Sequence, residues 1–173
     1  MKLYNARIPA IANAVVSTLT KEGCIEVSAE NRVEAERDLI AIMEEYRRRD
    51  NSLRDAVKEF MALHNTPYER YGKVRQEIAD QWDHPLNAKV ESFLSRQFIE
   101  NFMISRFVDE VFAEDGELYK RIQGVIKTFD VDEAALRLEA EEKIKNVRPD
   151  SVEYEAALER SLKEVRKRHG LLD

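Results

Sequence analysis

The sequence predicts an all-α protein, built as a multi-helix bundle, and three observations support this prediction. Apolar residues recur every three or four positions along most of the chain. Only five glycines and four prolines interrupt its 173 residues. Charged residues make up 36% of the chain, well above the usual share of about a quarter. High charge with few chain breakers is typical of amphipathic helices whose outer faces lie in water.

The first helix is expected over residues 7–22. Its apolar face has helical spacing and consists of Ile8, Ile11, Ala12, Val15, Val16 and Leu19. Pro9 falls in the first turn, where a missing N–H costs little, and Gly23 is placed to end the helix in a left-handed conformation. Residues 24–27 alternate in polarity and predict one short extended segment.

A second helix is expected to begin at Ser28, a residue type that caps helix N-termini. Its apolar face consists of Val33, Leu39, Ile40, Ile42, Met43 and Tyr46. The periodicity weakens over residues 47–52 and returns with Leu53, Val57, Phe60, Met61 and His64. This pattern fits either one long bent helix or two helices with a break near Asn51.

Residues 65–69 form the clearest break in the helical pattern. Thr66 as N-cap, Pro67 in the first helical position and Glu69 two residues later have the spacing of a capping box. The apolar face of the helix that follows consists of Tyr71, Val74, Ile78 and Trp82. This helix is expected to end at residues 83–85, because a proline disfavours a helical residue before it.

Residues 86–112 are the most apolar part of the chain and predict a helix that is apolar on most sides. Such a helix is normally buried in the centre of a bundle or lies at an oligomer interface. Insertion into a membrane is the alternative. Four charged residues interrupt the segment and argue against it, namely Arg96, Glu100, Arg106 and Asp109.

The C-terminal third predicts a turn at residues 114–117 and three more helical segments. The apolar face of the first consists of Leu118, Ile122, Val125, Ile126 and Phe129. Asp130 and Glu133 have capping-box spacing before the second segment, which Pro149 is expected to end. Asp150 and Glu153 repeat that spacing before the last segment, which is expected to stop at Gly170.

The chain also matches itself when it is shifted by 83 positions. Leu19 then falls on Phe102, and Tyr71 falls on Tyr154. This match indicates two related helical halves, residues 1–83 and 84–173, which either form separate units or pack as one domain. The alternative is that an offset close to a whole number of helical turns aligns any two helices that are in phase.

Several motifs, taken in order, resemble the bacterial family known as domain of unknown function 507. They are residues 3–12, 23–28, 33–38, 65–68, 102–110, 131–133 and 166–171. The resemblance covers nearly the whole chain and implies a cytoplasmic, all-helical bacterial protein with elongated, protruding helical arms. It brings no catalytic or ligand-binding residues with it.

The sequence contains no recognisable set of catalytic, cofactor-binding or metal-binding residues. His64, His84 and His169 lack the Glu-x-x-His pairing of a di-iron bundle, so packed or partly exposed histidines are expected. Cys24 is expected to be a small buried residue, and a single cysteine fits a reducing cytoplasm. We therefore expect no enzyme activity and no cofactor.

Two arginine-rich patches are the candidate binding residues. The first consists of Arg47, Arg48, Arg49 and Arg54, and the second of Arg160, Lys163, Arg166, Lys167 and Arg168. These cations either pair with carboxylates on facing helices or contact phosphates. The net charge of −6 provides no general attraction for nucleic acid.

We therefore expect a cytoplasmic, non-enzymatic module that binds another macromolecule, with a protein as the expected partner and no membrane contact. Binding of RNA or DNA through the two patches is the alternative, and the oligomeric state stays open.

Overall fold

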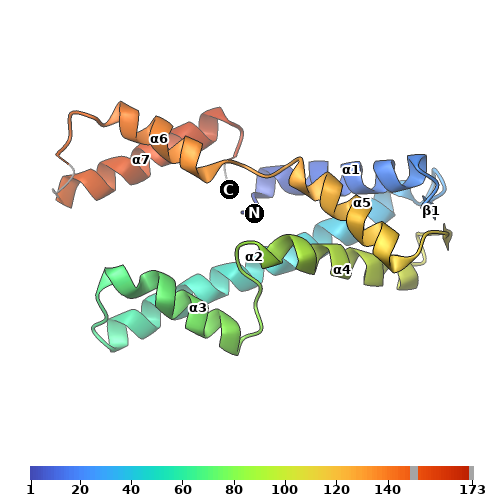
Figure 1. Cartoon of the computed structure of the whole chain (residues 1–173), viewed down its shortest axis with the longest axis horizontal. Helices are drawn as coiled ribbons and strands as arrows, with labels where there is room; N and C mark the ends of the chain where they lie inside the picture. Colours follow the sequence, from blue (N-terminus) through green and yellow to red (C-terminus); the bar gives the residue numbers. More distant parts are fainter. Residues whose placement is uncertain (149–151, 172–173) are drawn as a thin grey trace.

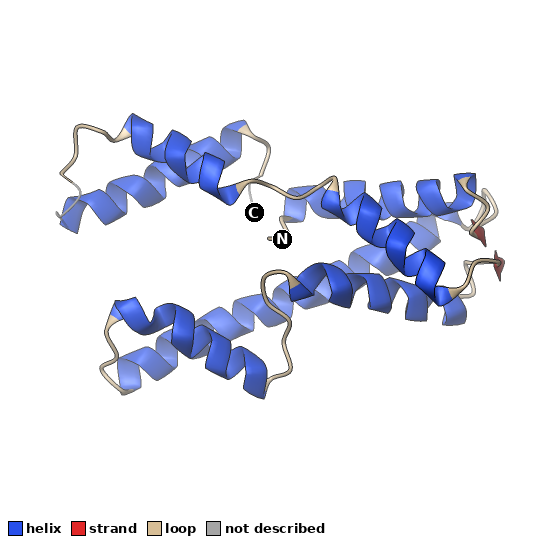
Figure 2. Ribbon diagram, in the orientation of Figure 1, coloured by secondary structure: helices blue, strands red, loops and turns tan. Residues whose placement is uncertain are grey.

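The computed structural model describes residues 1–148 and 152–171, and it is an all-α protein, as predicted. Its helices are α1 (Ile8–Lys21), α2 (Arg32–Leu63), α3 (Tyr71–Gln81), α4 (Lys89–Ile104), α5 (Asp115–Lys127), α6 (Glu133–Lys143) and α7 (Val152–Arg168). Two short strands, β1 (Ile25–Glu26) and β2 (Glu110–Val111), complete the fold (Figure 2).

Four helical segments form the body of the molecule: α1, the first half of α2, α4 and α5 (Figure 1). Their apolar faces share one core, and its fully buried residues include Ile11, Val15, Leu19, Leu39, Met43, Leu94, Phe98, Leu118, Ile122 and Ile126. The apolar segment after residue 86 therefore supplies a central helix of the body, since Leu94 and Phe98 are 0% exposed. Both predicted halves of the chain contribute to this core.

Two helical hairpins project from the same end of the body (Figure 1). Arm 1 consists of the second half of α2 and α3, and its own core contains Leu53, Val57, Val74, Ala79 and Leu86. Arm 2 consists of α6 and α7, and its core contains Tyr4, Leu136, Ala140, Leu158, Val165 and Leu171. The molecule is thus elongated, with two arms at one end and the strand pair at the other.

The helix ends confirm several sequence predictions. All six apolar residues predicted for the first helix are buried in α1. Gly23 and Gly170 have φ angles of +70° and +65°, the left-handed conformation expected where a helix stops. Residues 47–52 do not break the second helix, because α2 is continuous from Arg32 to Leu63.

Two predicted N-caps are wrong. Ser28 does not cap α2: its backbone N–H donates to Asp109 Oδ2 at 2.6 Å, and α2 begins only at Arg32. Thr66 makes no capping box either. The chain first forms a 3-10 turn at Tyr68–Arg70 without a side-chain cap, and α3 starts after it. Asn31 stands at the N-cap position of α2 without capping it, and its side-chain amide donates to Asp109 Oδ1 at 3.2 Å.

The apolar segment and the helix after it also differ from prediction. Ser105 is extended and ends α4, because its hydroxyl donates to Asp38 and accepts the N–H of Phe107. Residues 110–111 then form a strand rather than more helix. Residues 114–117 are not a separate turn, since α5 begins at Asp115.

The cap of α6 lies two residues after the predicted position. Asp132, and not Asp130, accepts the N–H of Ala135 at 3.0 Å. The Asp130 side chain instead accepts the N–H of the next residue, Val131. The predicted stop at Pro149 and cap at Asp150 lie outside the described residues.

The strand pair joins the two predicted halves of the chain. β1 and β2 are antiparallel, with Ile25 opposite Val111 and Glu26 opposite Glu110. Helix packing repeats between the halves as well: α1 packs on α2 and α5, and α4 packs on α5 and α2. These features support the proposal of an internal duplication, which stays a prediction. Over the described residues, no helix has the length and apolarity needed to cross a membrane.

Candidate interaction site between the arms

The first arginine patch is divided between two sides of α2. Arg47 Nη1 donates to the carbonyl of Leu3 at 3.1 Å, and Arg54 Nη2 lies 3.0 Å from Asp50 Oδ2. Arg47 and Arg54 are seven residues apart, so they share one helix face. Arg49 points to another side, where it donates to the carbonyl of Trp82 at 3.0 Å.

Arg48, the remaining member of the first patch, is exposed and pairs with Glu45 on its own helix. Such a pair on a helix surface contributes little to stability. The four arginines of the first patch therefore do not form one basic surface.

The second patch lies on α7 of arm 2. Arg166 Nη2 donates to Glu133 Oε2 at 3.0 Å, and Arg168 pairs with Glu139, so both cross from α7 to α6. The other three members, Arg160, Lys163 and Lys167, are exposed. The alternative that these cations pair with carboxylates of a facing helix is thus seen for Arg166 and Arg168.

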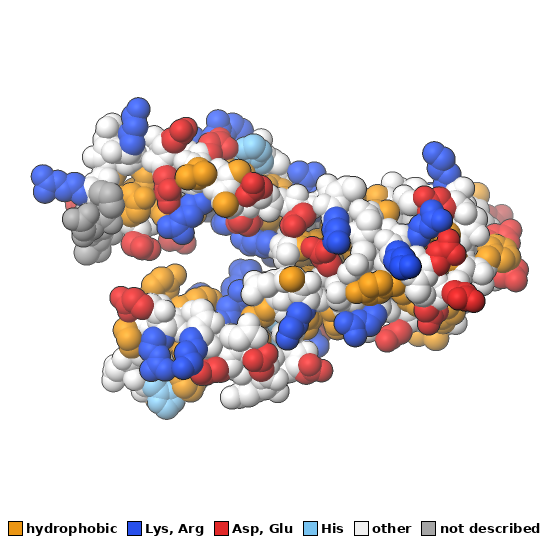
Figure 3. Space-filling model, viewed as in Figure 1, with side chains coloured by type: hydrophobic (Ala, Val, Ile, Leu, Met, Phe, Trp, Pro, Cys, Tyr) orange, Lys and Arg blue, Asp and Glu red, His pale blue; other side chains and the backbone are white. Residues whose placement is uncertain are grey.

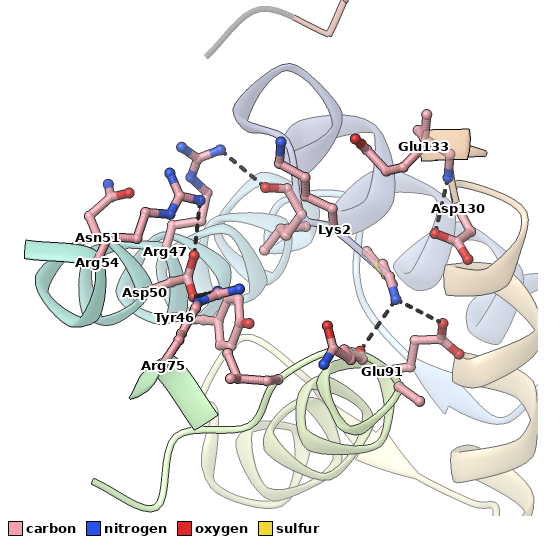
Figure 4. A pocket seen from close by; sticks show the side chains of 16 residues that line it. Lys2, Tyr46, Arg47, Asp50, Asn51, Arg54, Arg75, Glu91, Asp130 and Glu133 are labelled. Atoms are coloured by element: carbon pink, nitrogen blue, oxygen red, sulfur yellow. Dashed lines mark hydrogen bonds and ion pairs between the residues drawn. The ribbon is translucent and has the colours of Figure 1, made fainter. Parts of the chain in front are cut away.

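A cavity of about 550 Å³ lies where the two arms meet the body (Figure 4). Its charged and polar lining residues are Lys2, Arg47, Asp50, Asn51, Arg54, Arg75, Asn87, Glu91, Asp130 and Glu133. The structure brings Arg47 and Arg54 of the first patch to this cavity, but no residue of the second patch lines it. Figure 3 shows the open space between the arms, with basic side chains on both of its sides.

Sequence reasoning missed Lys2 and Arg75 as lining residues. Each lies far along the chain from Arg47, and tertiary packing brings them together. The sequence did contain one signal for this cavity, because Arg47, Asn51 and Arg54 have the spacing of residues on one helix face.

Asp50 is the centre of the contacts at the root of arm 1. Its carboxylate lies 2.7 Å from Arg75 Nη2 of α3 and 3.0 Å from Arg54 Nη2, and the residue is only 8% exposed. Burial alone would raise the pKa of Asp50, but the charge and hydrogen bond of Arg75 outweigh it and lower the pKa. Asp50 is therefore a charged group that ties α3 to α2.

His84 packs against the same group. Its ring stacks on Tyr46 with centroids 4.9 Å apart, and Nε2 lies 3.4 Å from Asp50 Oδ1 without hydrogen-bond geometry. Burial lowers the pKa of His84 and exceeds the opposite effect of Asp50, so the ring is neutral near pH 7. His84 is a packed histidine, as predicted, whereas His64 and His169 are exposed.

A similar group of contacts lies at the root of arm 2. The Tyr4 hydroxyl donates to Glu133 Oε1, and Arg166 donates to the other oxygen of the same carboxylate. Glu133 stands 83 residues after Asp50, which is the offset of the predicted repeat. The roots of the two arms thus have matching groups. Asp50 contacts Arg75 of α3 and His84, which precedes α4. Glu133 contacts Arg166 of α7 and Tyr4, which precedes α1.

The far end of arm 1 exposes large apolar side chains. Phe60 is 40% exposed, Leu63 76% and Tyr68 73%, and they flank the turn between α2 and α3. The Phe60 ring contacts His64, with centroids 4.3 Å apart, and Tyr68 stacks on Tyr71. We call Phe60, Leu63 and Tyr68 the arm-1 tip. Exposed apolar groups gathered in one place mark surfaces that contact other molecules.

Other chemically reactive groups show no assembled centre. Cys24 is buried, as predicted, and burial raises the pKa of its thiol. Among the residues that the structure describes, no three His, Cys, Asp or Glu side chains converge on a position that would suit a metal ion.

The fold and its surfaces define a class: an all-α protein with a shared core and two projecting helical arms. The chain belongs to the family described as "Protein of unknown function (DUF507)", whose model matches residues 1–171. This match confirms the resemblance seen in the sequence. A comparison with curated proteins finds no significant match.

Proposed function

We propose that this protein is a non-enzymatic interaction module that binds another protein with the arm-1 tip. The observation that carries the proposal is the exposure of Phe60, Leu63 and Tyr68 at the end of a projecting helical arm (Figure 1). Aromatic side chains contribute strongly to protein interfaces, because they bury much apolar area with little loss of conformational freedom. A projecting arm also presents this tip to a partner without obstruction by the body.

The position of the cavity supports a partner that reaches between the arms. The cavity lies where the two arms meet the body, so a partner that contacts the arm-1 tip and also enters the space between the arms would reach Arg54 and Arg75. Guanidinium groups at that place favour acidic groups on the partner.

The test is capture of partners from the native cell extract by the wild-type protein and by a double variant, Phe60→Ser with Leu63→Ser. The matched control is Leu138→Ser, which removes a side chain that is 64% exposed on arm 2. We expect one set of nuclease-resistant protein partners that is lost in the double variant and kept in the control. Equal capture by all three proteins would contradict the proposal.

The alternative is binding of RNA or DNA, and a specific observation favours it. Arg47, Arg54 and Arg75 line one cavity together with Lys2. Against it, Asp130, Glu91 and Glu133 line the same cavity and repel a polyanion. Fluorescence anisotropy with a labelled single-stranded RNA and a DNA duplex tests this alternative. A salt-dependent affinity that falls in Arg54→Gln, but not in Arg168→Gln, would support it.

A further inference from the structure

The two arms are connected to the body in different ways. In arm 1, α2 runs without interruption from the body core at Met43 to the arm core at Val57. In arm 2, α5 ends at Lys127 and α6 begins at Glu133, so residues 128–132 form a non-helical connection. A continuous helix resists bending, whereas a short non-helical connection allows two helical units to change their angle.

Little apolar surface holds arm 2 to the body. The core of arm 2 is separate from the body core. Among the described residues, Tyr4 is the one buried member of the arm-2 core that does not come from α6, α7 or the segments next to them. Tyr4 lies in the segment before α1 and is 1% exposed. Regions joined by few buried apolar contacts open at a low cost in free energy.

Polar contacts complete this joint. Glu133, the first residue of α6, accepts hydrogen bonds from Tyr4 and from Arg166, which lies on α7. Burial alone would raise the pKa of Glu133, but the hydrogen bonds from Tyr4 and Arg166 outweigh it and lower the pKa. The carboxylate is therefore ionised near pH 7, and hydrogen bonds to an ionised group are among the strongest in proteins.

We propose that arm 2 turns as a rigid body about residues 128–132, and that the contact among Tyr4, Glu133 and Arg166 latches it in the position seen here. Tyr4 belongs to the body, and Glu133 and Arg166 belong to the arm, so this contact must break when the arm turns. Asp130 and Glu133 line the cavity between the arms, and its shape therefore changes with the arm angle. The inference concerns motion and does not depend on the proposed protein partner.

The test measures two distances within the full chain by pulsed electron spin resonance. Cys24 is the only cysteine, so a Cys24→Ala background allows specific labelling. One label pair, Ile104→Cys with Leu138→Cys, reports the position of arm 2 relative to the body. The second pair, Ile104→Cys with Leu63→Cys, reports arm 1. All three sites are more than half exposed, which allows labelling without disturbance of the core.

Two variants release the proposed latch. Tyr4→Phe keeps the buried ring and removes its hydrogen bond, and Glu133→Gln removes the charge. In each we expect the arm-2 distance distribution to broaden and the share of displaced arms to rise about tenfold, as for the loss of one hydrogen bond to a charged group. The arm-1 distribution is expected to stay narrow. The control is Arg168→Gln, which removes a contact to Glu139 within arm 2 and leaves the latch intact.

Three results would overturn the proposal. The arm-2 distribution could stay narrow in both variants, or it could already be broad in the wild type and unchanged by the variants. The two label pairs could also broaden equally, which would indicate general loss of structure instead of motion at residues 128–132. Circular dichroism on the same samples identifies that third case.

Discussion

Arm 1 and arm 2 are both helical hairpins with small cores of their own. Arm 1 extends the body helix α2, whereas arm 2 is attached to the body through the non-helical residues 128–132. The sequence difference lies in equivalent segments of the two predicted halves, residues 45–49 and 128–132. The first is helical throughout. In the second, the Thr128 hydroxyl bonds back to the carbonyl of Val125, and the Asp132 side chain caps a new helix. Local side-chain hydrogen bonds thus end one helix and start another.

Similar helix packing does not imply similar mechanics in the two arms. The carboxylates Asp50 and Glu133 fix both arm roots, but Asp50 lies inside a continuous helix and Glu133 at a helix start. Loss of the contacts at Asp50 loosens α3 from α2, while loss of those at Glu133 frees a whole arm.

The largest effect is expected when arm 1 is given a break like that of arm 2. Asn51→Pro removes a helical hydrogen bond and adds a steric clash in the middle of α2, at a cost of about 3 kcal/mol of unfolding free energy or more. The distance distribution between labels at residues 63 and 104 should broaden. Asn51→Ala is the control, and it should leave the unfolding free energy and the distance distribution near their wild-type values. Wild-type stability in the proline variant would show that α2 does not stiffen arm 1.

A smaller effect is expected when the root of arm 1 loses its carboxylate. Asp50→Ala leaves Arg75 without its partner at a site that is largely buried, which should lower the unfolding free energy by about 2–3 kcal/mol. Urea denaturation measures this change. Asp55→Ala removes an exposed carboxylate from the same helix and should cost less than about 0.5 kcal/mol. Similar losses in the two variants would contradict a special role for Asp50.

Acidification should distinguish the two arm roots, because a histidine packs at one and a tyrosine at the other. The folded protein lowers the pKa of His84, so the neutral ring stabilises the fold above the unfolded pKa of about 6.5. This stabilisation is lost as the pH falls toward the lower, folded pKa, with a slope of at most about 1.4 kcal/mol per pH unit.

Urea denaturation between pH 7.5 and 5.5 tests this expectation. The loss of stability should be smaller in His84→Phe than in the wild type, and His64→Gln should behave as the wild type does. The carboxylates act at lower pH: the pKa values of Asp50 and Glu133 are lowered, so their stabilisation is lost only below about pH 4.5. An identical pH dependence in His84→Phe would contradict the role given to His84.

The smallest effect is expected from Gly124→Ala in α5. Gly124 is exposed, and an added Cβ would meet nothing within 4 Å. Alanine should raise the unfolding free energy by about 0.5–1 kcal/mol through its better helix propensity. The arm-2 distances should not change, because the substitution stiffens the helix before residues 128–132 and not the connection itself. A narrower arm-2 distribution would indicate that bending within α5 contributes to the motion.

The apolar periodicity of the sequence predicted the all-α fold and the buried face of α1, because that signal is local and repeats. The two glycine stops were also predictable, since a left-handed residue is required there. The N-caps at Ser28 and Thr66 were not: α2 begins only after Asn31, whose side-chain amide donates to Asp109, 78 residues away. Contacts of this kind depend on tertiary packing and leave no local pattern.

In the candidate site, too, local patterns could be predicted from the sequence and tertiary contacts could not. Arg47 and Arg54 share a helix face and could be grouped from their spacing. The hydrogen bond from Tyr4 to Glu133 links residues that are 129 positions apart, and no local sequence pattern connects them. The arginines of the second patch look alike in sequence, and what sets Arg166 and Arg168 apart in the structure is that each pairs with a carboxylate on α6.

The shared body core has a consequence for the order of folding during synthesis. The apolar faces of α1 and α2 are covered in part by α4 and α5, whose buried residues extend to Ile126. A nascent chain that ends before α5 therefore exposes apolar surface that is buried in the finished protein. The strand pair also forms late, because it closes a loop of more than 80 residues. We expect the body to fold only after most of the chain has left the ribosome, with arm 2 as the last part to form.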